Sequence, residues 1–468
     1  MGDEPEAGTE VEAVPAPAAV RAPAPAVSDN FVSNAPVLDL DDESGPLGME
    51  KHIPLMQRVP RLCPPLTELC TEVLAANFKD NNNFAAIPPK FQTRVVEILP
   101  TDLPLDVTCP QIADDYYWER CAIERWKNCN VVEHGGAWKR LYLERNLEDE
   151  IEALDENQTN LERLIKTIKL SAEFVMRLNI KELKSHMDVG ILFEGLPTLT
   201  DLGIIYGHRR VGMDYERSMF GMKNADATCL AKAIKYKAEL LTMVNLSSNL
   251  MDDDKLRLLV TGLLDNDTVT HIDVSHNRIA DRGARALARL LGETSVITSL
   301  NLCDNEVHGE GGKALGRVLT HNRSLLSLNL RLNRLGDDGG RLLAEGLRAN
   351  RALRELNCCG NAFAVEVGKI WHVLSTCCGR TCSHAVVFVQ AARSLSQAFA
   401  NNRTLTWLDL SCNQIGTEGG RLLRDGLENN TSLTAIDLRL NGVGQHLESA
   451  IAEALKSAEI RRQHVARK

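Results

Sequence analysis

The stretch "LLSLNLRLN", residues 325–333, decides the fold, because its apolar residues alternate and it ends in an asparagine. Leu325, Leu328, Leu330 and Asn333 define the pattern apolar, two variable, apolar, one variable, apolar, two variable, Asn. This alternation turns one side of a short strand towards a core and the other side towards solvent. The asparagine can satisfy backbone groups where the chain bends away from the strand, so we interpret it as structural.

The same pattern recurs between Leu241 and Leu455, and its asparagines are 28 residues apart except at one place. The copies end at Asn249, Asn277, Asn305, Asn333, Asn361, Asn413 and Asn441. A fixed period with this signature is typical of leucine-rich repeats. Each copy continues into a Gly-rich turn and a helical pattern, so we predict an α/β solenoid whose helices form the convex side. We expect this ribonuclease-inhibitor-like solenoid to span residues 196–468.

One interval departs from the period, because Asn361 and Asn413 are 52 residues apart and 24 residues have been added. Alignment of the flanking helical patterns places the insertion near residues 369–392, on the helix side of the repeat. The segment is apolar and Cys-rich, and its cluster of Cys377, Cys378, Cys382 and His384 has the spacing of no common zinc site. We therefore expect no metal and no cofactor.

Two regions precede the repeats. Residues 1–50 contain eleven Asp or Glu and one Arg, a net charge of −10 that equals the value for all 468 residues and leaves residues 51–468 formally neutral. We predict a disordered acidic Pro/Ala-rich leader over residues 1–55. Residues 56–195 are predicted to form a mainly helical domain, in which "DDYYWERCAIERW" supplies a helix whose Tyr116, Tyr117 and Trp118, with Trp126, belong to the core.

An apolar seam with a 4-3 rhythm runs from Leu147 to Val175 and predicts a long helix or two helices broken near Asn157. Thr159 and Glu162 have the spacing of a capping box, and Glu148 and Glu152 are predicted to lie on the wet side. Two uses of the seam remain open: packing on the first repeat of the solenoid, or a coiled-coil contact with another chain.

Several classes of function lack support in the sequence. There is no GxxxxGK[ST] phosphate loop, no HExxH and no GxSxG motif, so we expect no enzymatic activity. The formal neutrality of residues 51–468 predicts neither a nucleic-acid partner nor an acidic-membrane partner. The N-terminus carries no apolar stretch typical of a signal peptide, and no run of 18 apolar residues predicts a membrane span. An intracellular chain is expected.

The helical segment "DDYYWERCAIERWKNCNVVEHGGAWKRLYLERNLEDEIE", followed by "LFEGLPTLTDLGIIYG" and the 28-residue repeats, resembles the T-complex-associated testis-expressed protein 1 family. This family is the leucine-rich-repeat subunit 5 of the nexin-dynein regulatory complex, and the resemblance covers roughly residues 55–468. It implies a scaffold in the cytoplasm and cytoskeleton, in the axoneme of motile cilia and sperm flagella. It also implies other subunits of that complex as partners and, indirectly, doublet microtubules or dynein.

Two alternatives share the repeats: a GTPase-activating leucine-rich-repeat protein and a ribonuclease-inhibitor-like binding protein. A GTPase activator would need a catalytic arginine near the first repeats, where Arg209 and Arg210 form the only suggestive pair.

The outward-pointing strand positions predict where a partner binds. One column carries short polar groups at Asn245, Asp273, Asn301, Asn329, Asn357, Asp409 and Asp437. Trp407 stands beside this column at a solvent-facing position, and Trp and Arg are the residues that dominate binding hot spots. We therefore predict a contact patch of Trp407 with Arg331 and Arg439, flanked by Asp409 and Asp437. The alternative is that Trp407 covers the adjacent strand or the inserted segment.

Overall fold

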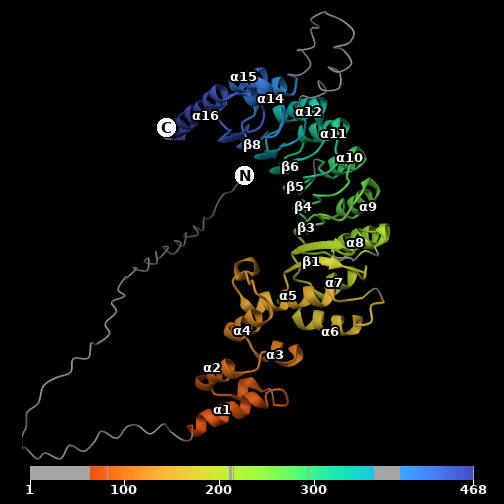
Figure 1. The fold of residues 1–468 in the computed structure, drawn as a ribbon, viewed down its shortest axis with the longest axis vertical. Helices are drawn as coiled ribbons and strands as arrows, with labels where there is room; N and C mark the ends of the chain where they lie inside the picture. The colour runs from red at the N-terminus through yellow and green to blue at the C-terminus, as the bar shows by residue number, and fades with distance from the viewer. Residues whose placement is uncertain are drawn as a thin grey trace, which may run out of the picture. The chain divides into compact units, whose positions relative to one another are not determined.

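The computed structural model of the chain describes residues 64–466, apart from residues 82, 156, 210–212, 214, 293–294, 363–389 and 429. The described residues form one parallel sheet of nine strands, and each strand pairs with the next along the chain. The strands are β1 (Arg177–Leu183), β2 (Asp201–Tyr206), β3 (Met243–Asn245), β4 (His271–Asp273), β5 (Ser299–Asn301), β6 (Ser327–Asn329), β7 (Glu355–Asn357), β8 (Trp407–Asp409) and β9 (Ala435–Asp437). Strands line one side of the repeat array and helices the other (Figure 1).

Helices follow the strands and pack against one another in chain order. Those of the array are α7 (Gly190–Gly195), α8 (Asn224–Tyr236), α9 (Asp253–Leu263), α10 (Asp281–Leu290), α11 (Gly309–Leu319), α12 (Gly336–Ala349), α14 (Gln390–Asn401), α15 (Gly416–Leu427) and α16 (Gln445–Ala466), with the short 3-10 helix η3 (Arg217–Met219). Those before the sheet are α1 (Leu66–Ala76), η1 (Phe84–Ala86), α2 (Pro89–Ile98), α3 (Leu105–Gln111), α4 (Asp115–Arg125), η2 (Val131–His134), α5 (Trp138–Glu152) and α6 (Leu161–Ser171).

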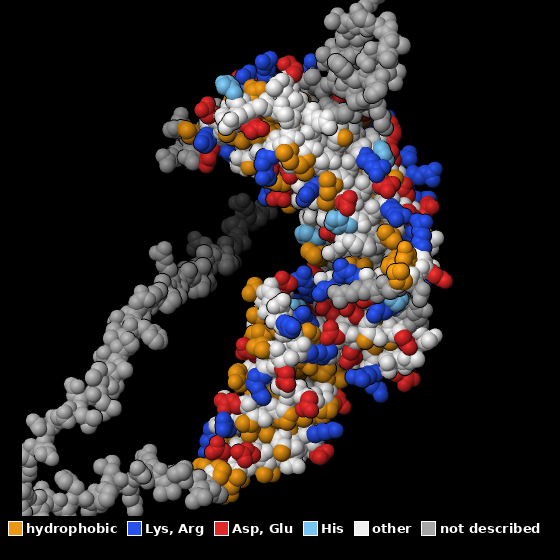
Figure 2. Space-filling view, in the orientation of Figure 1, with side chains coloured by type: hydrophobic (Ala, Val, Ile, Leu, Met, Phe, Trp, Pro, Cys, Tyr) orange, Lys and Arg blue, Asp and Glu red, His pale blue; other side chains and the backbone are white. Residues whose placement is uncertain are grey.

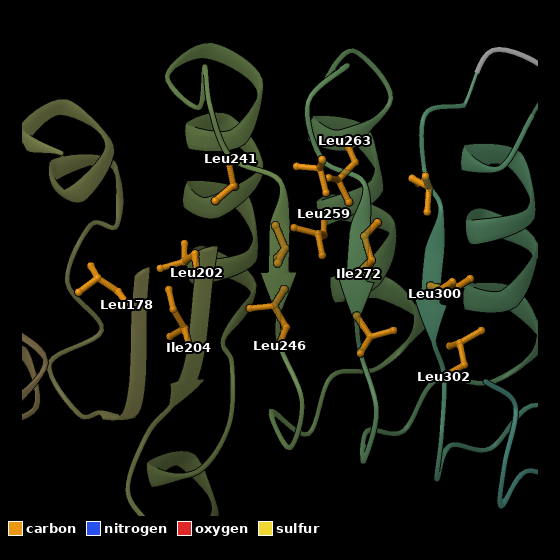
Figure 3. Packing of buried hydrophobic residues seen from close by; sticks show 14 of the residues in the cluster. Leu178, Leu202, Ile204, Leu241, Leu246, Leu259, Leu263, Ile272, Leu300 and Leu302 are labelled. Atoms are coloured by element: carbon orange, nitrogen blue, oxygen red, sulfur yellow. The ribbon is translucent and has the colours of Figure 1, made fainter. Parts of the chain in front are cut away.

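The core is the stack of apolar strand positions that the repeat pattern predicts. Ile272, Leu300 and Leu328 occupy the same register position on β4, β5 and β6, and each is buried. Figure 3 shows such side chains pointing from consecutive strands towards the helices, where Leu259 and Leu263 of α9 meet them. One repeat buries its apolar face only against its neighbours, so this continuous core holds the array together.

The repeat asparagines form a buried ladder, which confirms their structural interpretation. In each repeat the Nδ2 atom donates a hydrogen bond of 2.7–3.0 Å to a strand-end carbonyl of the preceding repeat. In Asn277 and Asn333, for example, the Oδ1 atom also accepts a backbone N–H. Each asparagine thus provides hydrogen-bond partners for buried backbone groups of its own repeat and of the preceding one, and a carbonyl such as that of Leu302 accepts from two successive asparagines.

A second asparagine ladder runs along the other end of the strands and was not predicted. Its members are buried, and each donates through Nδ2 at 2.7–3.0 Å to a carbonyl at the C-terminal end of the helix of the preceding repeat. They are Asn322, Asn350, Asn402 and Asn430. Asn322 and Asn402 belong to N-x-[ST] triplets. Their burial and hydrogen bonding make these triplets part of the fold and close them to glycosylation.

The aromatic helix α4 has the predicted place in the core, with one correction. Tyr117 and Trp118 are buried, and both donate a hydrogen bond to a backbone carbonyl. Trp126 is half-buried and packs on Tyr142 with ring centroids 5.4 Å apart. The prediction is wrong for Tyr116, which is 50% exposed because it lies on the outer side of the first turn of α4.

The apolar seam folds as two helices, α5 and α6, with the break where Asn157 was expected to interrupt it. Leu147 and Ile151 are fully buried, and α5 packs against β1, so within the described residues the seam is used inside the chain. The predicted capping box is wrong. The N-cap of α6 is Asn160, whose side chain makes no cap bond, and Thr159 instead donates to Asp155 at 3.0 Å.

Two predicted boundaries shift. The sheet begins at β1, inside the region predicted to be mainly helical, because the register partners Arg177, Asp201 and Met243 are 24 and 42 residues apart and escape the 28-residue pattern. At the insertion, residues 390–392 belong to α14, where Ala391 and Ala392 are buried. The rest of the predicted insertion and the acidic leader lie outside the described residues.

Candidate partner-binding surface

Trp407 lies at the start of β8, on the outer side of the sheet. Register pairing sets it between Glu355 of β7 and Ala435 of β9. The next residue, Leu408, points to the core and is fully buried, so Trp407 points away from it. Because Ala435 is small, Trp407 is uncovered on that side and remains 37% exposed. Most large aromatic side chains of a soluble protein are better buried, so this exposure favours a contact role.

The polar column beside Trp407 also has a local structural role. Each member accepts a hydrogen bond from the backbone N–H two residues further on, at 2.8–3.1 Å, as in an Asx turn. Asp409 accepts from the N–H of Ser411, and Asp437 accepts from that of Arg439. These short side chains therefore fold back on the ends of their own strands and project little from the sheet surface near Trp407.

Arg439 lies beside Asp437 and forms an ion pair with it. The guanidinium donates at 2.6 Å to Oδ2 and at 3.0 Å to Oδ1. The hydrogen bond from Arg439 lowers the pKa of Asp437 against the opposing effect of its partial burial. With the Arg439 side chain 82% exposed, such a pair contributes little to stability, and the guanidinium remains accessible to a partner.

Arg331 lies farther away than the predicted patch requires. It follows β6, two strands before β8, so strand spacing places it roughly 10 Å along the sheet from the residues of β8. Trp407, Asp409 and Asp437 therefore lie on the adjacent strands β8 and β9, and Arg439 follows β9 by two residues, beside Asp437. Arg331 lies at the margin of this group, which we call the β8–β9 surface (Trp407, Asp409, Asp437, Arg439).

The opposite end of the sheet is closed by three glutamates, two of which, Glu148 and Glu152, were predicted to lie in solvent. Glu144, Glu148 and Glu152 stand at every fourth position of α5 and therefore share one face of the helix. Their carboxylates accept the free backbone N–H groups along the outer edge of β1 at 2.6–2.9 Å. An edge strand covered in this way is closed to pairing with another chain.

Burial acts differently on these glutamates. Burial alone would raise the pKa of Glu144, but hydrogen bonds from His134 at 2.5 Å and Arg140 at 2.8 Å, with two backbone N–H groups, bring the pKa below its ordinary value. For Glu148, burial dominates and raises the pKa to about 7. The i, i+4 spacing was the signal for this edge cap. The same spacing is also found on solvent-exposed helix faces, so the cap could not be recognised without knowing the position of β1.

Of the remaining candidate residues, only Arg209 lies among those that the structure describes. The backbone N–H of Arg209 donates to Glu182, whereas Arg210 lies outside the described residues. The Cys377, Cys378, Cys382 and His384 cluster also lies outside them. Among the residues described, no helix combines the length and the apolar character that crossing a membrane requires.

Comparisons with known proteins agree with this architecture. The Leucine Rich repeat family matches residues 265–288, 295–316, 321–344 and 401–423. The chain is 44% identical over 200 residues to a protein named Dynein regulatory complex subunit 5 from Chlamydomonas reinhardtii, a match that covers 42% of this chain and 51% of the relative. It is 33% identical over 233 residues to the protein of the same name from Mus musculus, covering 44% and 47%. The chain spans about half the length of these curated relatives.

A solved structure named Leiomodin-1 Actin-Binding Site 2 is 16% identical and covers 53% of this chain and 95% of its own, with a TM-score of 0.25, too low to support an argument.

Parallel strands in register, stacked helices and the buried asparagine ladder define a leucine-rich-repeat protein. Its relatives are named as subunits of a regulatory complex. The chain is a relative of dynein regulatory complex subunit 5, as the resemblance of its helical half and its repeats predicted.

Proposed function

We propose that this chain is a non-enzymatic scaffold subunit of the nexin-dynein regulatory complex. The observation that carries the proposal is the 44% identity over 200 residues to a protein named Dynein regulatory complex subunit 5. On this proposal the chain resides in the axoneme of motile cilia and sperm flagella. It holds other subunits of the link between doublet microtubules and so helps to regulate dynein-driven sliding.

The β8–β9 surface is the proposed contact with a neighbouring subunit. Two features support this assignment: the exposed Trp407 at the start of β8 and the accessible guanidinium of Arg439 just after β9. The closed outer edge of β1 supports it indirectly, because a partner has no free strand edge to pair with at that end. Trp and Arg are enriched among the few residues that carry most of the binding free energy at interfaces.

The proposal is tested by replacing Trp407 with alanine in cells that lack their own copy of the subunit. We expect Trp407→Ala to weaken retention in isolated axonemes by about 2 kcal/mol or more, a factor of roughly 30, because a tryptophan anchor is lost. The fold should be unchanged, since the indole contributes to no buried core position.

Met243→Ala is the matched control. Met243 occupies the same register column on β3 and is also 37% exposed, but it lies five strands from Trp407. Its variant should be retained like the unmodified chain. Normal retention of a folded Trp407→Ala protein would move the interface away from the β8–β9 surface.

A further inference from the structure

One position of the repeat carries a cation on the outer side of six helices. Aligned by the repeat, these residues are Arg257, Arg285, Lys313, Arg341, Arg393 and Arg421. In four helices the cation is balanced by a carboxylate of its own helix, at 2.8–3.4 Å: Arg257 with Asp254, Lys313 with Glu310, Arg341 with Glu345, and Arg421 with Glu418. In these four helices, the cation at this repeat position, which we call the cation column, therefore forms an i, i+3 or i, i+4 ion pair at the surface.

Helix α10 breaks this design. The position three residues before Arg285 carries Arg282 instead of an acid, so the charge is doubled where other helices cancel it. The carboxylate of Asp281 forms no ion pair within the described residues and instead accepts, through Oδ1, the backbone N–H groups of His308 and Gly311 at the start of α11, both at 2.8 Å. Among the described residues, the Arg285 side chain donates to one group, the carbonyl of Asp281, at 3.3 Å.

The neighbouring helix α11 adds another positive charge that is not balanced by its own carboxylate. Arg317 is exposed near its C-terminal end, and the only carboxylate of that helix, Glu310, pairs with Lys313. Within the described part of the chain, neither Arg282, Arg285 nor Arg317 has a carboxylate within ion-pair distance. Lys and Arg side chains gather along the helix side of the array at this level in Figure 2.

A shallow groove of about 590 Å³ lies between α10 and α11 at the same place. Its polar lining comes from Arg285, Arg317, Thr320 and His321, and its apolar lining from the half-buried Ala288, Ala314 and Val318. Small apolar side chains between two helices leave room for the ridge of a third helix. Guanidinium groups beside such a groove match carboxylates, with which they form paired hydrogen bonds.

We propose that this α10–α11 groove binds an acidic helical segment of a partner protein, with Glu or Asp facing Arg285 and Arg317 and small apolar residues over Ala288 and Ala314. It is a second contact surface, on the helix side of the array, and does not depend on the β8–β9 surface. A nucleic acid or a membrane fits less well, because the surplus of positive charge is confined to two helices while residues 51–468 are formally neutral.

The test measures fluorescence anisotropy of a labelled helical peptide of Glu, Ala and Leu, titrated with the full chain at low ionic strength. Arg285→Glu combined with Arg317→Glu should weaken binding by at least about tenfold, because attraction becomes repulsion. The matched control combines Arg257→Glu with Arg421→Glu, two positions of the same column whose cations are already balanced, and should stay within about twofold. A peptide with every Glu replaced by Gln should not bind.

Circular dichroism verifies that both double variants are folded, which is expected because all four residues lie at the surface. Equal losses in the two double variants, or no saturable binding of the Glu peptide, would overturn the proposal. It would also fail if single-stranded RNA or anionic vesicles bound the chain through Arg285 and Arg317 while the Glu peptide did not.

Discussion

The asparagine ladder gives the sharpest prediction, and Asn333→Ala is its test. Asn333 is buried, its Oδ1 atom accepts the backbone N–H of Val307 at 3.1 Å, and its Nδ2 atom donates to the carbonyls of Leu302 at 2.8 Å and Leu330 at 3.0 Å. Alanine leaves the buried N–H of Val307 without its partner, whereas the carbonyls of Leu302 and Leu330 each keep one donor, Nδ2 of Asn305 at 3.1 Å and Nδ2 of Asn361 at 2.7 Å. A buried donor left unsatisfied costs roughly 1–3 kcal/mol, so the free energy of unfolding should fall by about 2 kcal/mol.

Asn329→Ala is the control, because Asn329 lies in the same repeat but is half-buried and makes a single bond to the backbone N–H of Arg331. It should cost less than about 1 kcal/mol. Urea unfolding followed by circular dichroism measures both losses. Hydrogen exchange at the Val307 amide, which should quicken only in Asn333→Ala, locates the effect. A loss in Asn333→Ala no larger than in Asn329→Ala would refute the structural role of the ladder.

Two further predictions concern burial of charge and close packing. Glu148 has a folded pKa of about 7 against an ordinary 4.5, so the ionised carboxylate destabilises the fold and the unmodified chain should lose stability as pH rises from about 4.5 to about 7. Glu148→Gln keeps an acceptor for the backbone N–H of Asn179 without the charge. In urea unfolding, the free energy of unfolding of this variant should equal that of the unmodified chain below pH 4.5 and exceed it by about 2 kcal/mol above pH 7. A difference in stability that does not change with pH would contradict a raised pKa for Glu148. Gly346→Ala should destabilise the array by more than the roughly 1 kcal/mol that alanine contributes to a helix, because a Cβ there would lie 2.1 Å from the carbonyl oxygen of Gly316 on α11. A higher melting temperature for this variant would show that α11 and α12 can separate at little cost.

The two ends of the sheet differ in a way that bears on assembly. At β1 the carboxylates of α5 occupy the backbone donors of the strand edge. At β8 and β9, Trp407 and Arg439 are exposed on the outer side of the sheet. The edge of β1 is therefore closed to pairing with another strand, while the β8–β9 end presents exposed side chains.

The linear sequence determined the repeat architecture by itself. A strand pattern with period two and a helix pattern, repeated every 28 residues, leave one way to bury the apolar positions, and Leu300, Leu328 and Leu356 stack as the pattern requires. The buried role of Asn333 could also be predicted, because the bend after a strand needs a side chain that both donates and accepts. The exposure of Trp407 followed from its outward position in the same period.

Only the tertiary structure decided what the irregular parts do. The strand β1 escaped prediction because its spacing to β2 and β3 follows no period, and so the charged face of α5 could not be recognised as an edge cap. Arg285 and Arg317 are 32 residues apart in sequence, and an acid, Asp281, stands four residues before Arg285 without pairing with it. Which carboxylate a cation meets depends on how the helices stack, because side-chain pairing at the surface is set by distances in space that the repeat period does not contain.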